Sequence, residues 1–243
     1  MNSFTPEPVR RESVFSREVF VSIKRFILVI IQSIYRFFIP QSKKFVSEDI
    51  ILVTGSGSGL GRSLATQFSG LGATLILWDI NSQNNEETAA IIRAMGGHCF
   101  TYTCDVSNRE DVYKTAKLVK QEVGEITILI NNAGIVSGRS ILECSDHLIE
   151  KTMRVNLLSL FWTVKAFLPD MMKQNHGHIV NIASSAGLAG ISKLGDYSSS
   201  KFGVIGFTEV LQYEMKFSGY TGVHTTVVCP AMINTGMFQG ARM

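Results

Sequence analysis

From Asp49 to Cys229 the sequence alternates short apolar runs with segments of helical pattern, and this alternation restricts the fold more than any other feature. The apolar runs are hydrophobic throughout, which is typical of parallel strands buried on both faces of a sheet. Repeated strand–helix units with right-handed crossovers build a doubly wound sheet. We therefore predict an α/β domain with a parallel sheet and helices on both faces. The predicted strands are Ile50–Val53, Thr74–Trp78, His98–Thr103, Ile126–Ile130, His178–Ala183 and His224–Cys229.

A glycine-rich turn, TGSGSGLG at Thr54–Gly61, joins the first predicted strand to its helix. Gly55 permits the tight turn, Gly59 lets the backbone approach a pyrophosphate, and Gly61 lets the helix pack close to the strand. The free N–H groups and the dipole of the helix N-terminus favour phosphate there. Because a strand precedes the turn and a helix follows it, we interpret it as the dinucleotide-binding turn of a Rossmann-type sheet.

Asp79 ends the second predicted strand, about 20 residues after this turn, where an acid binds the adenine ribose hydroxyls of NAD. A carboxylate there repels the 2′-phosphate of NADP, and neither Ile80 nor Asn81 supplies a cation. The residues therefore favour NAD, with NADP as the alternative. An aspartate that only caps the next helix would look the same in the sequence.

The N-terminal residues differ from the rest of the chain. Residues 1–18 are polar and predict a tail, and residues 19–40 predict a hydrophobic helix. Lys24, Arg25 and Arg36 flank its most apolar stretch, Phe26–Tyr35. A spanning helix needs about 20 apolar residues, so this segment would anchor the chain by spanning a membrane or lying in its interface. A surface helix packed on the domain is the alternative. Residues 41–48 would be a linker, and residues 49–243 the nucleotide-binding domain.

The composition excludes several classes of protein. With 45% hydrophobic and 18% charged residues, the chain is neither disordered nor collagen-like. Its four Cys form no CxxC pair and its five His lack ligand spacing, so we expect reduced thiols and no metal site. A net charge of +3 gives no reason to expect a nucleic-acid partner.

Tyr197 and Lys201 lie one turn apart on a predicted helix and share a face. A nearby ammonium lowers the pKa of a phenol, which would make Tyr197 a general base for an alcohol. Ser184 follows the fifth predicted strand, at the sheet edge where ligands bind, and would hydrogen-bond the substrate oxygen. Alternatively, the pair is an ordinary helix-surface pair and Ser184 only a turn serine. Leu188, Ile191 and Leu194 suit an apolar pocket, or simple packing.

Together these motifs resemble the short-chain dehydrogenase/reductase superfamily, from about Asp49 to Gly236. The motifs are TGSGSGLG, Asp105-Val106, NNAG at 131–134, Asn156, Ser184 and YSSSK at 197–201. The strings LWDIN, INNAGIV and HGHIVNIASSAG resemble its membrane-associated branch. Within that branch the chain resembles the epidermal-type retinol dehydrogenases (family 16C), with lipid-droplet 17β-hydroxysteroid dehydrogenases nearby.

The resemblance implies a role for each matching residue. Asn156 would hold a proton-relay water beside Ser184 and Tyr197, and Lys201 would also bind the nicotinamide ribose. Pro230 and Thr235 match a PGxxxT segment near the carboxamide, although Ala231 replaces its glycine. The remaining residues implied at the cofactor are Gly55, Ser58, Gly59, Leu60, Gly61, Asp79, Asp105, Val106, Asn132, Ala133, Gly134 and Tyr197.

The resemblance also predicts the activity: hydride transfer from a hydrophobic alcohol to NAD, at the endoplasmic reticulum or a lipid droplet. All-trans-retinol is the first expected substrate and a 17β-hydroxysteroid the second. Family members continue after Thr235 with a lid, a helix and a seventh strand, so we expect this chain to lack them and to expose strand six. The long helices after strands four and five predict oligomers, with itself or with relatives. The alternatives are an inactive membrane or lipid-droplet protein that keeps nucleotide binding, and a nucleotide sensor.

Overall fold

The structure is a computed structural model that describes residues 44–231 and 233, together with positions 19, 23–24, 26–27 and 30–31. The chain divides into two compact units, residues 1–44 and 45–243. The predicted tail at 1–18, most of the predicted anchor at 19–40, part of the linker at 41–48 and Thr235 lie outside the described residues. Within the described part, no helix has the length and apolar character needed to cross a bilayer.

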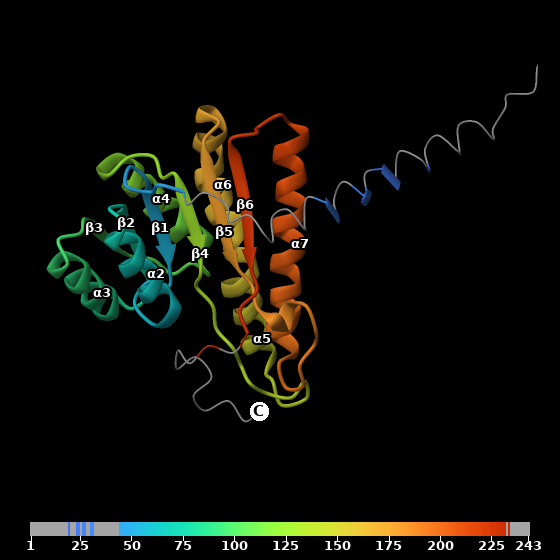
Figure 1. Ribbon diagram of the computed structural model, residues 1–243. Helices are drawn as coiled ribbons and strands as arrows, with labels where there is room; N and C mark the ends of the chain where they lie inside the picture. Colours follow the sequence, from blue (N-terminus) through green and yellow to red (C-terminus); the bar gives the residue numbers. More distant parts are fainter. Residues whose placement is uncertain are drawn as a thin grey trace, which may run out of the picture. The chain divides into compact units, whose positions relative to one another are not determined.

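Six parallel strands form one sheet with the order β3-β2-β1-β4-β5-β6, and the order reverses between β1 and β4 (Figure 1). This arrangement confirms the predicted Rossmann-type sheet. It also creates a crevice at the carboxyl ends of β1 and β4, where doubly wound sheets bind ligands. The strands are β1 (Ile50–Thr54), β2 (Thr74–Asp79), β3 (Cys99–Thr103), β4 (Ile128–Asn131), β5 (Gly177–Ile182) and β6 (Val223–Val228).

The helices follow the strands in the predicted alternation. The long helical region predicted after strand four starts at Asp146, because Ser145 caps the first turn. It also contains a π-helical segment between two α-helices. The helices are α2 (Gly59–Gly70), α3 (Ser82–Ala94), α4 (Arg109–Glu122), α5 (Asp146–Met153), the π-helix η1 (Arg154–Leu158), α6 (Ser159–Gln174), the short 3₁₀-helix η2 (Ser185–Gly187) and α7 (Gly195–Phe217).

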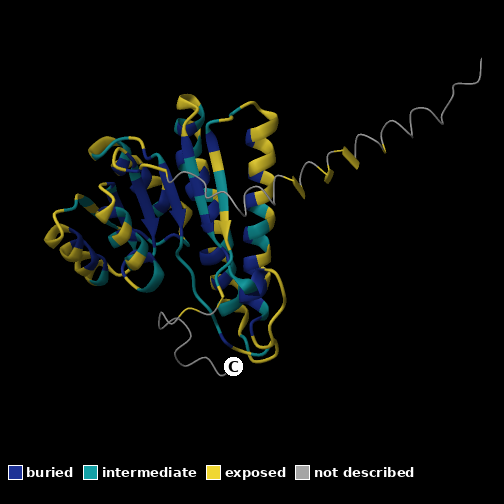
Figure 2. Ribbon diagram, in the orientation of Figure 1, coloured by how far each residue is buried: buried dark blue, intermediate teal, exposed yellow. Residues whose placement is uncertain are grey.

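Two hydrophobic clusters lie on the two faces of the sheet. On one face, side chains of α2 and α3 such as Ala65 and Ile92 pack on Val53. On the other face, side chains of α4, α6 and α7 pack around Trp78 and Phe167. Strands β1, β2 and β4 are therefore almost wholly buried (Figure 2), as their apolar sequences predict.

Strands β5 and β6 are less covered than the centre of the sheet. In β5 the burial alternates from residue to residue, so that only the face toward α6 and α7 is closed. Val227 and Val228 of β6 are 36% and 39% exposed at the sheet edge. Among the described residues, β6 is thus one edge of the sheet, and β3 is the other.

Candidate active site

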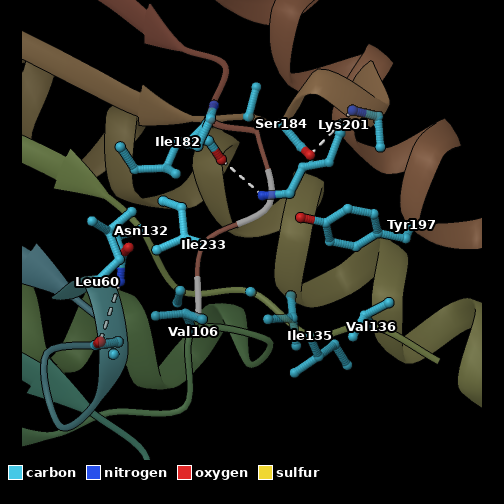
Figure 3. A pocket seen from close by; sticks show the side chains of 18 of the residues that line it. Leu60, Val106, Asn132, Ile135, Val136, Ile182, Ser184, Tyr197, Lys201 and Ile233 are labelled. Atoms are coloured by element: carbon cyan, nitrogen blue, oxygen red, sulfur yellow. Dashed lines mark hydrogen bonds between the residues drawn. The ribbon is translucent and has the colours of Figure 1, made fainter. Parts of the chain in front are cut away.

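A cavity of about 790 Å³ opens at the carboxyl ends of the strands, between the glycine-rich turn and the start of α7 (Figure 3). Leu60 and Asn132 lie at one end, and Tyr197 lies at the other beside Ile135 and Val136. The predicted site residues that line it are Gly55, Ser58, Gly59, Leu60, Asp79, Asp105, Val106, Asn132, Ala133, Gly134, Ser184, Tyr197, Lys201 and Pro230. Gly61 and Asn156 are not among the lining residues, and the structure does not describe Thr235.

The glycine-rich turn needs its glycines for two different reasons. Gly55 has φ +65°, a left-handed conformation that costs glycine little. At Gly61 a Cβ atom would lie 2.0 Å from the Gly55 carbonyl oxygen and 2.6 Å from Asn132 Nδ2. Gly61 therefore lets α2 pack against the turn instead of facing the cavity. Its predicted packing role is consistent with this geometry, while direct contact with a cofactor is not.

Helix α3 supports the turn from behind, through buried polar residues that the sequence analysis missed. Ser56 Oγ donates to Asn85 Oδ1 at 2.7 Å, and Thr88 Oγ1 donates to the Ser56 carbonyl at 3.0 Å. From α2, the partly exposed Arg62 adds a bond from Nη2 to the Gly57 carbonyl at 2.5 Å. The sequence did contain a signal for these contacts. Asn85 and Thr88 are polar residues at helical spacing on the same face of α3 as the apolar Ala89 and Ile92. These bonds hold the turn open toward the cavity.

Asp79 is both a lining residue and a support for the turn. Its Oδ2 accepts from the Gly57 amide at 2.8 Å, and its Oδ1 accepts from the Asn81 amide at 2.8 Å. The N-cap of α3 is Asn81, whose Oδ1 accepts from the Asn84 amide. Asp79 is therefore not the capping residue that the alternative interpretation required. The carboxylate is oriented at the mouth of the turn, where it faces the cavity.

The segment after β4 is tied to the end of β1 by paired bonds. Asn132 Nδ2 donates to the carbonyls of Thr54 and Gly55, at 2.9 and 3.2 Å. Thr54 Oγ1 in turn accepts from the amides of Asn132 and Ala133. The Nδ2 group of Asn132 is therefore committed to the protein backbone, where it joins the ends of β1 and β4.

Asp105 and Val106 close the cavity wall after β3. Asp105 Oδ1 accepts from the amide and the hydroxyl of Ser107, and Asp111 Oδ2 accepts from the Asp105 amide. This turn leaves the Val106 side chain against the cavity. The wall there is apolar, as the face of an adenine ring requires.

Tyr197, Ser184 and Lys201 meet at the other end of the cavity. The Tyr197 hydroxyl and the Lys201 ammonium point into the same part of it (Figure 3). Lys201 Nζ donates to the Ile182 carbonyl at 2.7 Å and lies 5.6 Å from the centre of the Tyr197 ring. At Gly187 of η2, a Cβ would lie 2.7 Å from the Lys201 carbonyl, so the glycine lets η2 and Ser184 pack tightly on α7.

The electrostatics of this pair differ from the prediction. Burial raises the pKa of Tyr197 above its usual value of 10.0, and the hydrogen bond with the Ser184 side chain offsets only part of the rise. Burial also lowers the pKa of Lys201 from 10.5 to about 8. The expected lowering of the Tyr197 pKa is therefore not found, because burial disfavours the charged phenolate.

Asn156 lies in the π-helix η1, behind the cavity wall, and is 1% exposed. Its Oδ1 accepts from the Ile135 amide at 2.8 Å, and its Nδ2 donates to the Ile135 carbonyl and to Ser200 Oγ. Single π-helical turns are frequent at functional sites, since they re-aim a side chain. In this structure Asn156 holds the loop after β4 and does not reach the cavity.

The apolar residues predicted near Ser184 divide into two groups. Ile191 and Leu194 line the cavity, whereas Leu188 is 65% exposed and does not. Ile135, Val136, Val155 and Ile233, which the sequence analysis did not single out, complete the apolar lining. Their chain positions gave no signal, because they come from three separate segments that carry no motif.

A cradle of glycines for phosphates, an oriented carboxylate and a buried tyrosine–lysine pair suit a nicotinamide nucleotide and an alcohol. The fold and site together define an NAD(P)-dependent alcohol oxidoreductase. The chain belongs to the short-chain dehydrogenase/reductase family: the model of that family, described as short chain dehydrogenase, matches residues 49–243.

Curated relatives support this assignment. Short-chain dehydrogenase/reductase family 16C member 6 of Bos taurus is 51% identical over 221 residues, which cover 90% of this chain and 70% of the relative. Retinol dehydrogenase 10 of Homo sapiens is 47% identical, covering 93% and 74%. Epidermal retinol dehydrogenase 2 of Homo sapiens is also 47% identical, covering 93% and 73%. The resemblance to family 16C is thereby confirmed.

Solved structures of the same family share this fold. A short chain dehydrogenase/reductase from Burkholderia phymatum in complex with NAD superposes with a TM-score of 0.78 and 32% identity, covering 83% of this chain and 72% of that chain. A metagenomic short-chain oxidoreductase in complex with NADP gives a TM-score of 0.73 and 27% identity, covering 78% and 85%. Neighbours of this fold thus bind either nucleotide.

Proposed function

We propose that this protein oxidises a hydrophobic alcohol, with all-trans-retinol as the first candidate and a 17β-hydroxysteroid as the second. The observation that carries the proposal is the chemical division of the cavity. The hydroxyl and amine groups of Tyr197 and Lys201 meet at one end, among aliphatic side chains that include Val136 and Ile191. The names of the relatives add retinol to this argument, since two of those reported above are retinol dehydrogenases.

Each residue has a proposed part in the reaction. Ser184 orients the substrate oxygen, and Tyr197 takes the hydroxyl proton as the carbon gives its hydride to the nicotinamide. When bound, an oxidised nicotinamide would add a positive charge to this site, and that charge would favour the Tyr197 phenolate. Lys201 retains the Tyr197 orientation and binds the nucleotide ribose, while Asn156 acts from behind through Ile135.

We also propose that the protein prefers NAD to NADP. Asp79 holds its carboxylate at the mouth of the turn through two backbone amides. A 2′-phosphate next to that carboxylate would be repelled. Arg62, the nearest cation of the turn, is already bound to Glu87 and to the Gly57 carbonyl.

Membrane attachment through residues 19–40 is a further part of the proposal. Among the described positions there, Ile23, Phe26, Ile27 and Ile31 are helical and between 49% and 67% exposed. Exposed aliphatic and aromatic side chains of this density need a lipid or protein surface. Flotation with phosphatidylcholine vesicles tests this: Ile27→Glu with Ile31→Glu should release the protein, and retention of the double variant would contradict the anchor.

The test of the function is turnover of all-trans-retinol with NAD, followed as retinal by chromatography, with a 17β-hydroxysteroid in parallel. Tyr197→Phe should lower turnover by at least about 100-fold, because general-base catalysis contributes roughly that much. Tyr213→Phe is the matched control, since Tyr213 lies on the same helix, 47% exposed and away from the cavity. Full turnover by Tyr197→Phe would refute the mechanism. NAD binding by the parent chain without turnover of either alcohol would instead favour the non-enzymatic alternative.

A further inference from the structure

A buried carboxylate next to Tyr197 takes no part in the chemistry proposed above. Asp196 is 9% exposed and lies in the first turn of α7. Its Oδ1 accepts from Ser137 Oγ and its Oδ2 accepts from Thr152 Oγ1, both at 2.7 Å. A carboxylate is costly to bury, and short hydroxyl bonds to both oxygens offset that cost. The two partners come from the loop after β4 and from α5, so one side chain joins three segments.

The hydrogen bonds of Asp196 and those of Asn156 join the same three segments: the loop after β4, the helices α5 and η1, and α7. Thr152 and Asn156 lie one turn apart on α5 and η1, and Asp196 and Ser200 lie one turn apart on α7. Thr152 bonds Asp196, and Asn156 bonds Ser200, so the two helices are joined at two successive levels. The loop after β4 is held at both levels as well, because Asn156 bonds Ile135 and Asp196 bonds Ser137.

The start of α7 has no side-chain cap, and neither has the start of α2. The N-termini of α3, α4 and α5 are capped by the side chains of Asn81, Asn108 and Ser145. The N-cap of α7 is Leu194, which makes no side-chain cap bond. Asp196 places a negative charge in the first turn, where the helix dipole favours it. Its carboxylate oxygens, however, accept hydrogen bonds from Ser137 and Thr152, which belong to other segments. The first turn of α7 is thereby held from outside the helix.

We infer that Asp196 is a positioning residue, whose bonds to Ser137 and Thr152 hold Tyr197 against the substrate end of the cavity. The loop it fixes contributes Val136, which lines that end and packs in one cluster with Leu194 and Tyr197. Without the carboxylate, the loop and the first turn of α7 lose one of the two levels of hydrogen bonds that join them. The inference rests on the proposed role of Tyr197 in alcohol oxidation.

The test compares Asp196→Ala with Asp196→Asn. An asparagine has the same shape, and hydroxyls can both donate and accept, so Asp196→Asn can keep both bonds. In Asp196→Ala we expect kcat/KM for the alcohol to fall by about 10- to 100-fold, the usual effect of a small misplacement of reacting groups. Asp196→Asn should stay within about threefold of the parent, because its geometry is retained. Ser198→Ala is the matched control: Ser198 lies on the other side of Tyr197, is 6% exposed, and its hydroxyl has no hydrogen-bond partner among the described residues.

Two further readouts separate positioning from loss of folding. The affinity for NADH should change by less than about threefold in every variant, because the nucleotide end of the cavity makes none of these bonds. Hydrogen exchange of residues 134–153 should accelerate in Asp196→Ala and not in Asp196→Asn or Ser198→Ala.

Unchanged exchange and an unchanged kcat/KM in Asp196→Ala would overturn the inference. An equal loss of NADH affinity would also overturn it, because that result indicates general unfolding. Should the parent chain turn over no alcohol, the proposed function fails, and the exchange measurement alone still decides whether Asp196 holds the loop.

Discussion

Replacing Gly61 by alanine tests whether the glycine-rich turn is as tightly packed as the geometry indicates. The new Cβ would lie 2.0 Å from the Gly55 carbonyl oxygen and 2.6 Å from Asn132 Nδ2. Both atoms belong to the bonds that tie β1 to the segment after β4, since Asn132 donates to Gly55. The methyl group must therefore displace the turn and the crevice wall together.

The expected cost follows from overpacking. Adding a methyl group to a closely packed site costs about 1–3 kcal/mol. If the methyl group destabilises only the conformation that binds the nucleotide, NADH binding weakens by about 5- to 150-fold, at 1.4 kcal/mol per factor of ten. If the methyl group destabilises the whole folded state instead, the Tm falls by about 2–12 °C for a domain of this size. We expect the first effect to dominate, because the displaced atoms lie at the cavity edge.

The assay is a titration with NADH followed by its fluorescence, combined with thermal unfolding with and without the nucleotide. Gly206→Ala is the control: Gly206 lies in α7, and a Cβ there meets nothing within 4 Å. An alanine in an exposed helix stabilises by up to about 1 kcal/mol relative to glycine, so this control should raise the Tm slightly and leave binding unchanged. NADH affinity within twofold of the parent for Gly61→Ala would show that the turn relaxes easily, and the packing argument would fail.

Three other changes test the site and its support. Asp79→Ser removes the carboxylate that repels a 2′-phosphate, so the ratio of NADP to NAD affinity should rise by about tenfold or more in parallel titrations; an unchanged ratio would remove Asp79 as the determinant. Burial lowers the pKa of Lys201 to about 8 from 10.5. The unfolded chain then binds more protons between these values, so this group makes stability rise by about 3 kcal/mol from pH 8 to 10.5. Lys201→Met should lose that rise in urea melts at several pH values, and parallel profiles for the two proteins would contradict the burial effect. Asn181→Ala leaves the Asn131 amide and the Thr208 hydroxyl without their partner. It should lower the free energy of unfolding by about 2–4 kcal/mol, and a loss below about 1 kcal/mol would mean that water replaces the amide.

The sequence was sufficient for the order of the elements and for the nucleotide end of the site. Apolar strands such as Thr74–Trp78 are short and continuous, and each is followed by a helical pattern, so local periodicity identifies the sheet. The glycine-rich turn is likewise local: strand, glycines and helix follow one another within Ile50–Gly70. Asp79 could be placed because it ends the strand that pairs with β1.

Sequence patterns were insufficient where a role depends on which groups face each other. The family resemblance implied that Asn156 holds a relay water, and only the structure shows that its side chain lies behind the wall and bonds Ile135. The pKa of Tyr197 was predicted to fall, because spacing shows a neighbouring lysine but does not show how much water both groups lose on burial. Val136 and Val155 reach the cavity through segments that carry no motif.

The sequence by itself therefore determined the alternation of strands and helices and the place of the glycine-rich turn, because both are local patterns in the chain. Only the tertiary structure decided how the catalytic end is held. Asp196 bonds Ser137 across 59 positions and Thr152 across 44. No periodicity links residues so far apart, and their interaction exists only once the strands and helices have packed and excluded water around them.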